Sequence, residues 1–163
     1  MPALLVPPAT SAAIACALRA GAFPSFSDFV TRSLQKPGRR GAVEAMLHVN
    51  REVFRTLFIA LLVGGAAISP LIVLIALPHS DNAARVYVLA GSAIYLVAVF
   101  AVTLLGNVPA NIPLDRLNRH SPEVVVYWPA FYSGWTNYNH IRTVRAAAAV
   151  ICYLLASLTL AAS

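Results

Sequence analysis

Four long apolar segments dominate the sequence and constrain its fold more than any other feature. They cover residues 4–30, 53–77, 86–106 and 143–162. Each has about the length of ~20 residues that an α-helix needs to cross a bilayer. In lipid such segments become helices, because a helix satisfies its backbone polar groups internally. The sequence therefore predicts an all-α polytopic membrane protein, with one domain over residues 1–163 that forms a four-transmembrane-helix bundle.

The charge content supports the membrane class and argues against nucleic acid as a partner. Only 11% of the residues are charged, whereas soluble domains carry about 25%. The net charge is +6, but the basic residues flank apolar segments instead of lining an aromatic-rich soluble face. The predicted partners are the lipid bilayer and a lipophilic small molecule, and homo-oligomerisation stays open.

The distribution of Lys and Arg predicts the sidedness of the protein. The loops after the first and third segments, with their flanks, hold ten basic residues, whereas the loop between the second and third segments holds only Arg85. Cytoplasmic loops are enriched in Lys and Arg, so we expect a multi-pass protein of the cell membrane with both termini outside and both long loops in the cytoplasm. Residues 42–55 alternate at helical spacing and predict a short interfacial helix that leads into the second span. The ten basic residues are Arg32, Lys36, Arg39, Arg40, Arg51, Arg55, Arg116, Arg119, Arg142 and Arg145.

The first segment contains a charged residue, Arg19. No Lys or Arg precedes it, so the segment lacks the positive start of a signal peptide and is interpreted as a retained helix, with cleavage as the alternative. If the span starts near Leu4, the Arg19 side chain can snorkel to the membrane boundary. If it starts near Pro8, the charge needs a partner. We favour snorkelling. Asp28, further along, is placed to pair with Arg32 at i,i+4.

The stretch from Tyr127 to Arg142 combines aromatic and polar residues, and it includes Trp128 and Trp135. Such rings favour the boundary between headgroups and hydrocarbon, so the stretch predicts an interface platform before the last span. A helix start at Asn139–Arg142 would direct backbone donors, an imidazole and a guanidinium to one place, which suits an anion or a phenolate.

Polar residues at the predicted cytoplasmic ends of the helices form a candidate site. Polar groups at membrane depth usually pair with one another or face a wet cavity. Asn107 and Asn111 have an alternative role, because Pro109 and Pro113 break the helix there and free carbonyls that the amides could satisfy. The cluster contains Asp28, His48, Asn50, Arg51, Asn107, Asn111, Trp135, Asn139, His140 and Arg142.

The two cysteines, Cys16 and Cys152, lie in apolar segments. They are interpreted as small buried hydrophobic residues. A disulfide between the first and last helices is the alternative.

Four motifs occur in an order that resembles a known family. They are GAFPSFSDFV at 21–30, AMLHVNR at 45–51, NVPAN at 107–111 and WTNYNHIRT at 135–143. Together they resemble the anthrone oxygenase-like family of small integral membrane proteins, long classified as a domain of unknown function.

The resemblance implies a four-helix membrane bundle and, as in a few characterised fungal members, oxidation of an anthrone to an anthraquinone with dioxygen. The sequence departs from the family at Leu47, where Gln is common, and at Pro24, which leaves the substrate open. The family's recurring polar positions match Asn50, Asn107, Asn111, Trp135, Asn139, His140 and Arg142, and a subgroup shares Asp28.

On this basis we expect catalytic roles for His140, Asp28 and Arg142, and substrate binding by Asn50, Asn107, Asn111, Trp135 and Asn139. His140 or Asp28 would take a proton from a phenolic substrate, and Arg142 with the amides would hold the oxyanion. No metal site or cofactor is predicted, although metal and haem stay open. A metal version would use Asp28, His48 and His140, which lack zinc-ligand spacing.

Whether the protein is an enzyme stays open at this point. The alternative is a non-enzymatic membrane accessory protein, or one that binds a lipid or small molecule. An enzyme should have an apolar pocket capped by His140, Arg142 and the asparagines, whereas an accessory protein should have these groups mutually satisfied.

Overall fold

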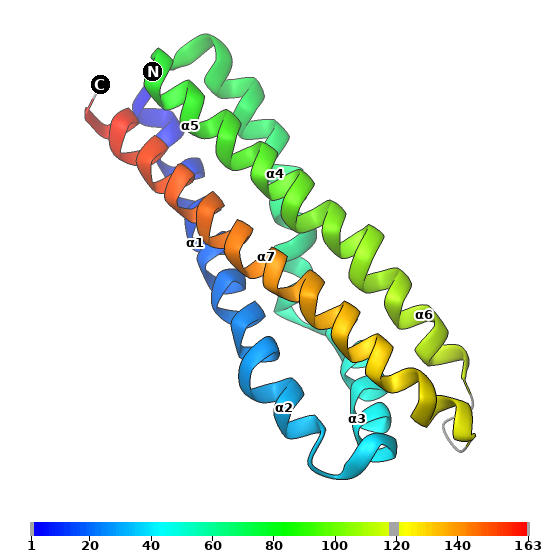
Figure 1. Ribbon diagram of the computed structural model, residues 1–163. Coiled ribbons are helices and arrows are strands. Elements are labelled where there is room, and N and C mark those ends of the chain that lie inside the picture. Colours follow the sequence, from blue (N-terminus) through cyan, green and yellow to red (C-terminus); the bar gives the residue numbers. More distant parts are fainter. Residues whose placement is uncertain (1, 118–120, 163) are drawn as a thin grey trace.

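The computed structural model describes residues 2–117 and 121–162, and its helices form one elongated bundle (Figure 1). The all-α class is confirmed, since this part of the chain contains no strand. In order, the elements are η1 (Pro2–Leu5), α1 (Val6–Ser25), η2 (Phe26–Val30), α2 (Thr31–Leu34), α3 (Gly38–Glu52), η3 (Val53–Arg55), α4 (Leu57–His79), α5 (Asn82–Ala93), η4 (Ile94–Ala101), η5 (Thr103–Asn107), α6 (Val108–Arg116) and α7 (Pro122–Ala162). Of these, η1 and η3 are 3-10 helices, and η2, η4 and η5 are π-helical.

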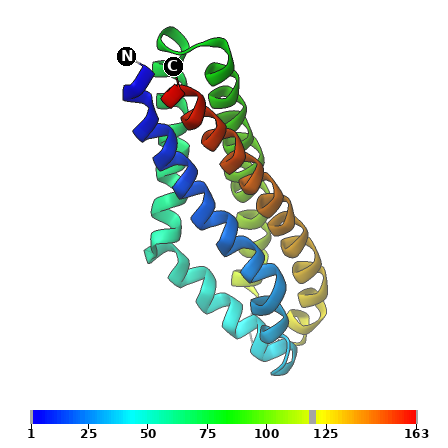
Figure 2. The same ribbon diagram turned by 90° about the vertical axis from the view of Figure 1, so that its left-hand side faces the viewer.

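In the described part of the chain, three helices are long and apolar enough to cross a membrane. They are Leu57–His79, Ala83–Arg116 and Pro122–Ala162. They contain the third and fourth predicted spans and most of the second, which begins at Leu57 and not at Val53 as predicted. These helices indicate a membrane protein. The N-terminal helix α1 packs along α7, and both termini lie at the same end of the bundle (Figure 2).

The third apolar helix continues through both prolines that were expected to break it. The prediction of a break at Pro109 and Pro113 is wrong, because α6 runs through Pro113 to Arg116. The π-helical turn η5 ends at Asn107, two residues before Pro109. Such a wide turn accommodates a residue that has no N–H and whose ring would clash with the preceding turn.

The last helix begins far earlier than expected. It starts at Pro122, where Pro and the acidic Glu123 both suit a helix N-terminus. The predicted helix start at Asn139–Arg142 is therefore wrong, and those backbone N–H groups lie inside a continuous helix. Residues 118–120, which include Arg119 of the predicted basic loop after the third segment, lie outside the described residues.

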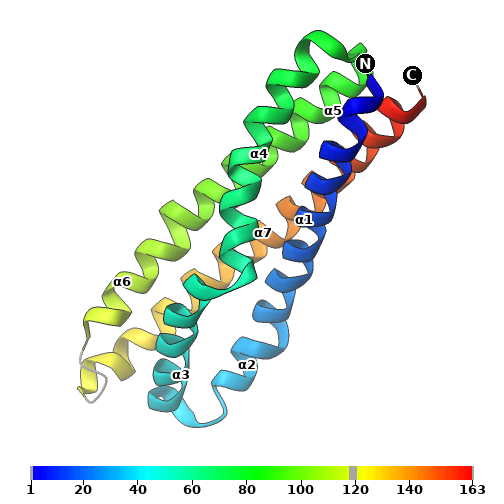
Figure 3. The same ribbon diagram turned by 180° about the vertical axis from the view of Figure 1, so that it is seen from behind.

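The amphipathic helix and the second span are separated by a break. Helix α3 ends at Glu52, and after η3 the chain turns at Thr56, whose backbone is extended (φ −109°, ψ 161°). The Thr56 hydroxyl donates to the Val53 carbonyl at 2.7 Å and stabilises the break. In Figure 3, α3 lies below the start of α4. There α3 contacts α6 and α7.

The described residues form two apolar cores that hold the bundle together. One joins α1, α4, α5 and α7, and the other lies between α3, α6 and the first half of α7. The second core contains Trp128 and Trp135, which are only 4% and 7% exposed. The expectation that they act as interface anchors is wrong, because the apolar face of α3, with Val43 and Met46, packs in the same cluster.

Arg19 is buried and does not snorkel, so that expectation is wrong as well. Its guanidinium donates to the carbonyls of Ala15 at 2.9 Å and Leu61 at 2.7 Å, and to the Tyr95 hydroxyl. Gly65 of α4 leaves the necessary room, since a Cβ there would lie 2.7 Å from Arg19 Nη1. The charge thus has the polar partners that a buried cation requires.

Two smaller expectations are settled by the coordinates. Asp28 pairs with Arg32 at 3.4 Å, as predicted. Cys16 and Cys152 are free thiols, so the alternative of a disulfide is wrong.

Candidate functional site

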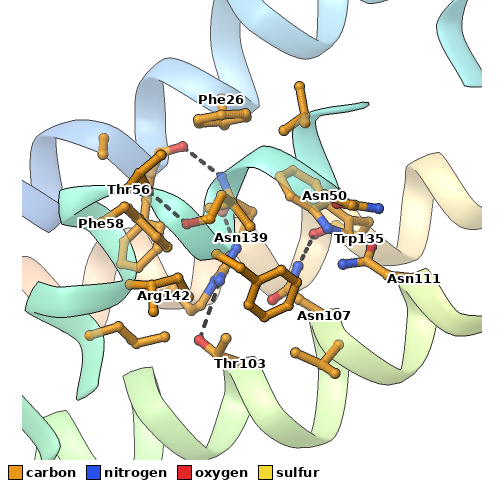
Figure 4. Close-up of a pocket in the computed structure, with 18 of the residues that line it drawn as sticks. Phe26, Asn50, Thr56, Phe58, Thr103, Asn107, Asn111, Trp135, Asn139 and Arg142 are labelled. Atoms are coloured by element: carbon orange, nitrogen blue, oxygen red, sulfur yellow. Dashed lines mark hydrogen bonds between the residues drawn. The ribbon is translucent and has the colours of Figure 1, made fainter. Parts of the chain in front are cut away.

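A cavity of about 460 Å³ borders both apolar cores, since residues of each line it. Figure 4 shows the side chains around it. Its size falls within the range of about 300–1,000 Å³ that is usual for small-molecule sites. Most of the wall is apolar, with contributions from α1, η2, α4 and the α3–α4 break. The residues in the wall that carry polar atoms on their side chains are Asn50, Glu52, Thr56, Thr103, Asn107, Asn111, Trp135, Asn139 and Arg142.

Arg142 brings a buried positive charge to this cavity. Its side chain is 4% exposed, and the guanidinium carbon lies 4.5 Å from the centroid of the Phe23 ring. Nη1 donates to the Thr103 hydroxyl at 3.2 Å, and Nη2 donates to Oδ1 of Asn139. Within the described residues Arg142 forms no ion pair with a carboxylate. A buried cation without a counter-charge is costly, so the site favours an anion or an oxyanion as its occupant.

Asn139 fixes the position of Arg142. Its Nδ2 donates to the Phe23 carbonyl and to the Ser27 hydroxyl, both at 2.6 Å. These two acceptors determine the orientation of the amide, so Oδ1 must point to the guanidinium. Asn139 therefore ties α7 to the end of α1 and to η2.

Unpartnered polar atoms are concentrated around the cavity. Folded proteins leave few buried polar atoms without a hydrogen bond. In the part of the chain that the structure describes, eight such side-chain atoms are found, and five belong to residues of the cavity wall. Three are N–H donors and two are carbonyl acceptors, which fits a guest with both oxygen acceptors and a hydroxyl donor. The five atoms are Arg142 Nε, Trp135 Nε1, Asn50 Nδ2, Asn107 Oδ1 and Asn111 Oδ1.

Asn107 does not serve the carbonyls freed by the nearby prolines. Its Nδ2 donates to the Trp135 carbonyl of α7 at 3.2 Å. This bond turns its Oδ1, which has no partner, away from Trp135. Asn107 thus joins η5 to α7 and offers the cavity an acceptor.

The structure brings six of the eight predicted site residues to the cavity, and leaves two outside. His140 and Asp28 are exposed, and neither lines the cavity. His140 follows Asn139 and is rotated by about 100° around the helix, so it faces outward. Asp28 is occupied by its ion pair with Arg32. The pocket capped by His140 that we expected is therefore not found.

The residues of the metal alternative are not gathered into one site. Within residues 2–117 and 121–162, no three His, Cys, Asp or Glu side chains form a group that could hold a metal ion. His48, the third residue of that alternative, is exposed on α3.

Sequence reasoning missed three polar residues of the wall, which are Glu52, Thr56 and Thr103. Thr103 lies four residues before Asn107, so helical spacing places both on one face and could have found it. Glu52 carried no comparable signal. It reaches the cavity because the chain breaks at Thr56, and no spacing rule predicts that break.

Comparison with known proteins identifies a family. A family model described as Anthrone oxygenase matches residues 44–152. The matched segment covers most of the chain from α3 into α7, and includes every predicted site residue except Asp28. No curated protein and no solved structure matches the chain.

Proposed function

Because the chain belongs to the anthrone oxygenase family, we propose that it is a membrane oxidoreductase that acts on a phenolic polycyclic substrate with dioxygen. The reaction would take place in the cavity next to Arg142. The observation that carries this proposal is the buried guanidinium, which has no carboxylate partner in the described part of the chain and lies in an apolar wall with four other unpartnered polar atoms.

The chemistry needs a group that stabilises negative charge. An anthrone has a methylene that is conjugated through its aromatic rings to a ring carbonyl. When the methylene loses a proton, the electron pair spreads to the carbonyl oxygen and creates an oxyanion. Arg142 Nε and Trp135 Nε1 are unpartnered donors in the cavity wall, and preorganised donors in an apolar site stabilise such charge strongly.

The remaining steps balance with dioxygen as the oxidant. The deprotonated carbon transfers electrons to O₂ and forms a C–O bond, and uptake of a proton gives a hydroperoxide. Loss of the second C–H proton with cleavage of the O–O bond then yields the new carbonyl and water. The sum is anthrone plus O₂ to anthraquinone plus water.

The membrane arrangement of the proposal adds α1 as a fourth crossing. Among the residues with described structure, three helices are apolar enough to span a membrane, and both termini lie at one end of the bundle (Figure 2). An even number of crossings is needed for that arrangement, and α1 supplies the missing one. The basic loops would then face the cytoplasm, with α3 at the interface and the cavity on the cytoplasmic side. A lipophilic substrate would reach the cavity from the bilayer.

The test uses purified protein in lipid nanodiscs with anthrone and oxygen. We expect quinone formation and oxygen uptake faster than the uncatalysed oxidation. Arg142→Gln should slow turnover at least ~100-fold, the usual effect of removing an oxyanion donor. Arg145→Gln is the matched control, since Arg145 is exposed one turn further along α7, and it should retain wild-type turnover.

Two results would contradict the proposal. Anthrone binding without any turnover would instead support the alternative, a non-enzymatic binding or accessory protein. Wild-type turnover by the Arg142→Gln variant would remove the guanidinium from the mechanism.

A further inference from the structure

Among the residues that the structure describes, Glu52 is the one acidic residue in the cavity wall. The bases expected from the sequence, His140 and Asp28, lie outside the cavity, and the asparagines are not bases at neutral pH. We propose that Glu52 accepts the proton whose removal starts the oxidation, an inference that rests on the proposed function.

The local structure gives Glu52 no other role. Within the described residues its carboxylate has no ion pair and no hydrogen bond, whereas its neighbour Arg51 pairs with Asp115 at 3.3 Å. Glu52 is also the last residue of α3. A carboxylate at a helix C-terminus faces the negative end of the helix dipole, so this position does not stabilise the fold. Since the carboxylate of Glu52 does not stabilise the fold at this position and borders the cavity, a role in the reaction explains its presence better than a structural role.

Glu52 and Arg142 differ in their exposure to solvent, and this difference separates the proton from the oxyanion. Glu52 is exposed beside the break at Thr56, next to Phe54, which is 65% exposed and also lines the cavity. These exposed residues of the wall lie at the mouth of the cavity. Arg142 is only 4% exposed. A proton taken by Glu52 can therefore pass to water, while the oxyanion remains in the dry part of the site, where electrostatic interactions are stronger.

The step itself is a simple proton transfer. The methylene C–H bond breaks, an O–H bond forms on the Glu52 carboxyl group, and the electron pair moves to the oxygen of the guest. Glu52 then releases its proton to water. Nothing is oxidised at this stage, so the step should occur without oxygen.

Because the proton transfer needs no oxygen, it can be measured separately from the oxidation. Wild-type protein in nanodiscs is incubated with anthrone in D₂O under argon, and deuterium incorporation at the methylene is followed by mass spectrometry. We expect exchange above the rate in empty nanodiscs. Glu52→Gln should reduce it to that background, and Glu52→Asp should restore part of it. The matched control is Glu123→Gln, an exposed glutamate on α7, which should exchange like wild type.

A binding measurement separates the possible failures. Equilibrium dialysis of anthraquinone should show that Glu52→Gln still binds, as a proton acceptor predicts. If this variant loses binding, Glu52 is a binding group and the inference is wrong. If it exchanges or oxidises anthrone at the wild-type rate, the inference fails while the proposed function stands. If wild-type protein neither exchanges nor oxidises anthrone, the proposed function fails first.

Discussion

The carboxamide of Asn139 holds the guanidinium of Arg142, one turn further along α7, by accepting a hydrogen bond from Nη2. The same amide donates to Phe23 and Ser27 at 2.6 Å. The cation is thus oriented by a side chain that is itself fixed to the end of α1. In the proposed function, this arrangement makes Asn139 a positioning residue.

Replacing Asn139 by Ala should impair turnover more than binding. The variant loses the bonds that orient Arg142, so the guanidinium is no longer preorganised for the oxyanion, and we expect kcat for anthrone to fall by at least tenfold with a smaller change in KM. Loss of the buried hydrogen bonds should also lower the free energy of unfolding by about 1–3 kcal/mol. Asn137→Ala, at an exposed position of α7, is the control and should change neither quantity. Wild-type kcat in Asn139→Ala would contradict the positioning role.

Two adjacent glycines of α4 should respond in opposite ways to the same substitution. A Cβ at Gly65 would lie 2.7 Å from Arg19 Nη1 and 2.8 Å from the Tyr95 ring, whereas a Cβ at Gly64 would meet nothing within 4 Å. Gly65→Ala should therefore destabilise the protein by about 1–3 kcal/mol through overpacking. Gly64→Ala should stabilise it by up to ~1 kcal/mol through helix propensity. Thermal unfolding in detergent checks both, and equal shifts of Tm would argue against the placement of Arg19.

Much of the fold was predictable, because long apolar segments are a local signal that survives in any context. The position of Arg19 was not predictable in this way. Whether it snorkels depends on which helix packs against α1, and on Gly65 of that helix leaving room for the guanidinium. Both facts belong to tertiary structure. The early start of α7 was missed because its aromatic residues were interpreted as an interface, although Pro122 and Glu123 are ordinary signals of a helix start.

The candidate site was predictable to the extent that it depends on residue type. Asparagines and an arginine in apolar surroundings indicated a shared cavity, and Asn107 and Arg142 indeed line it. The wrong predictions concern the face of a helix on which a residue lies. His140 is adjacent in sequence to Asn139 but lies on another face of α7, and only the packing of α1 against that helix decides which face is inside. Glu52 could not be predicted because it reaches the cavity only through the break at Thr56.

The predicted sidedness can be tested by labelling single cysteines. In a background without Cys16 and Cys152, Arg39→Cys lies near the start of α3 and Ala83→Cys near the start of α5, at opposite ends of the bundle (Figure 3). A maleimide that cannot cross the membrane, applied to intact cells, should label position 83 and not position 39. Position 39 should react after the cells are opened, which controls for its accessibility. Labelling of both in intact cells would contradict the proposed topology.

Replacing Asn111 by Leu should separate stability from ligand binding. Asn111 Oδ1 is buried and has no hydrogen-bond partner in the described part of the chain, so an apolar side chain of similar size removes an unpaired polar atom. We expect the ligand-free protein to gain about 1 kcal/mol of unfolding free energy. A hydroxylated anthrone should then bind about 5–10-fold more weakly, the equivalent of one lost hydrogen bond, whereas anthrone without hydroxyl groups should bind as it does to wild type. Thermal unfolding and equilibrium dialysis measure the two effects. If the variant instead has lower stability and binds the hydroxylated compound like wild type, Asn111 supports the fold and not the ligand. The reason is that a polar group kept for a ligand lowers stability only while the ligand is absent.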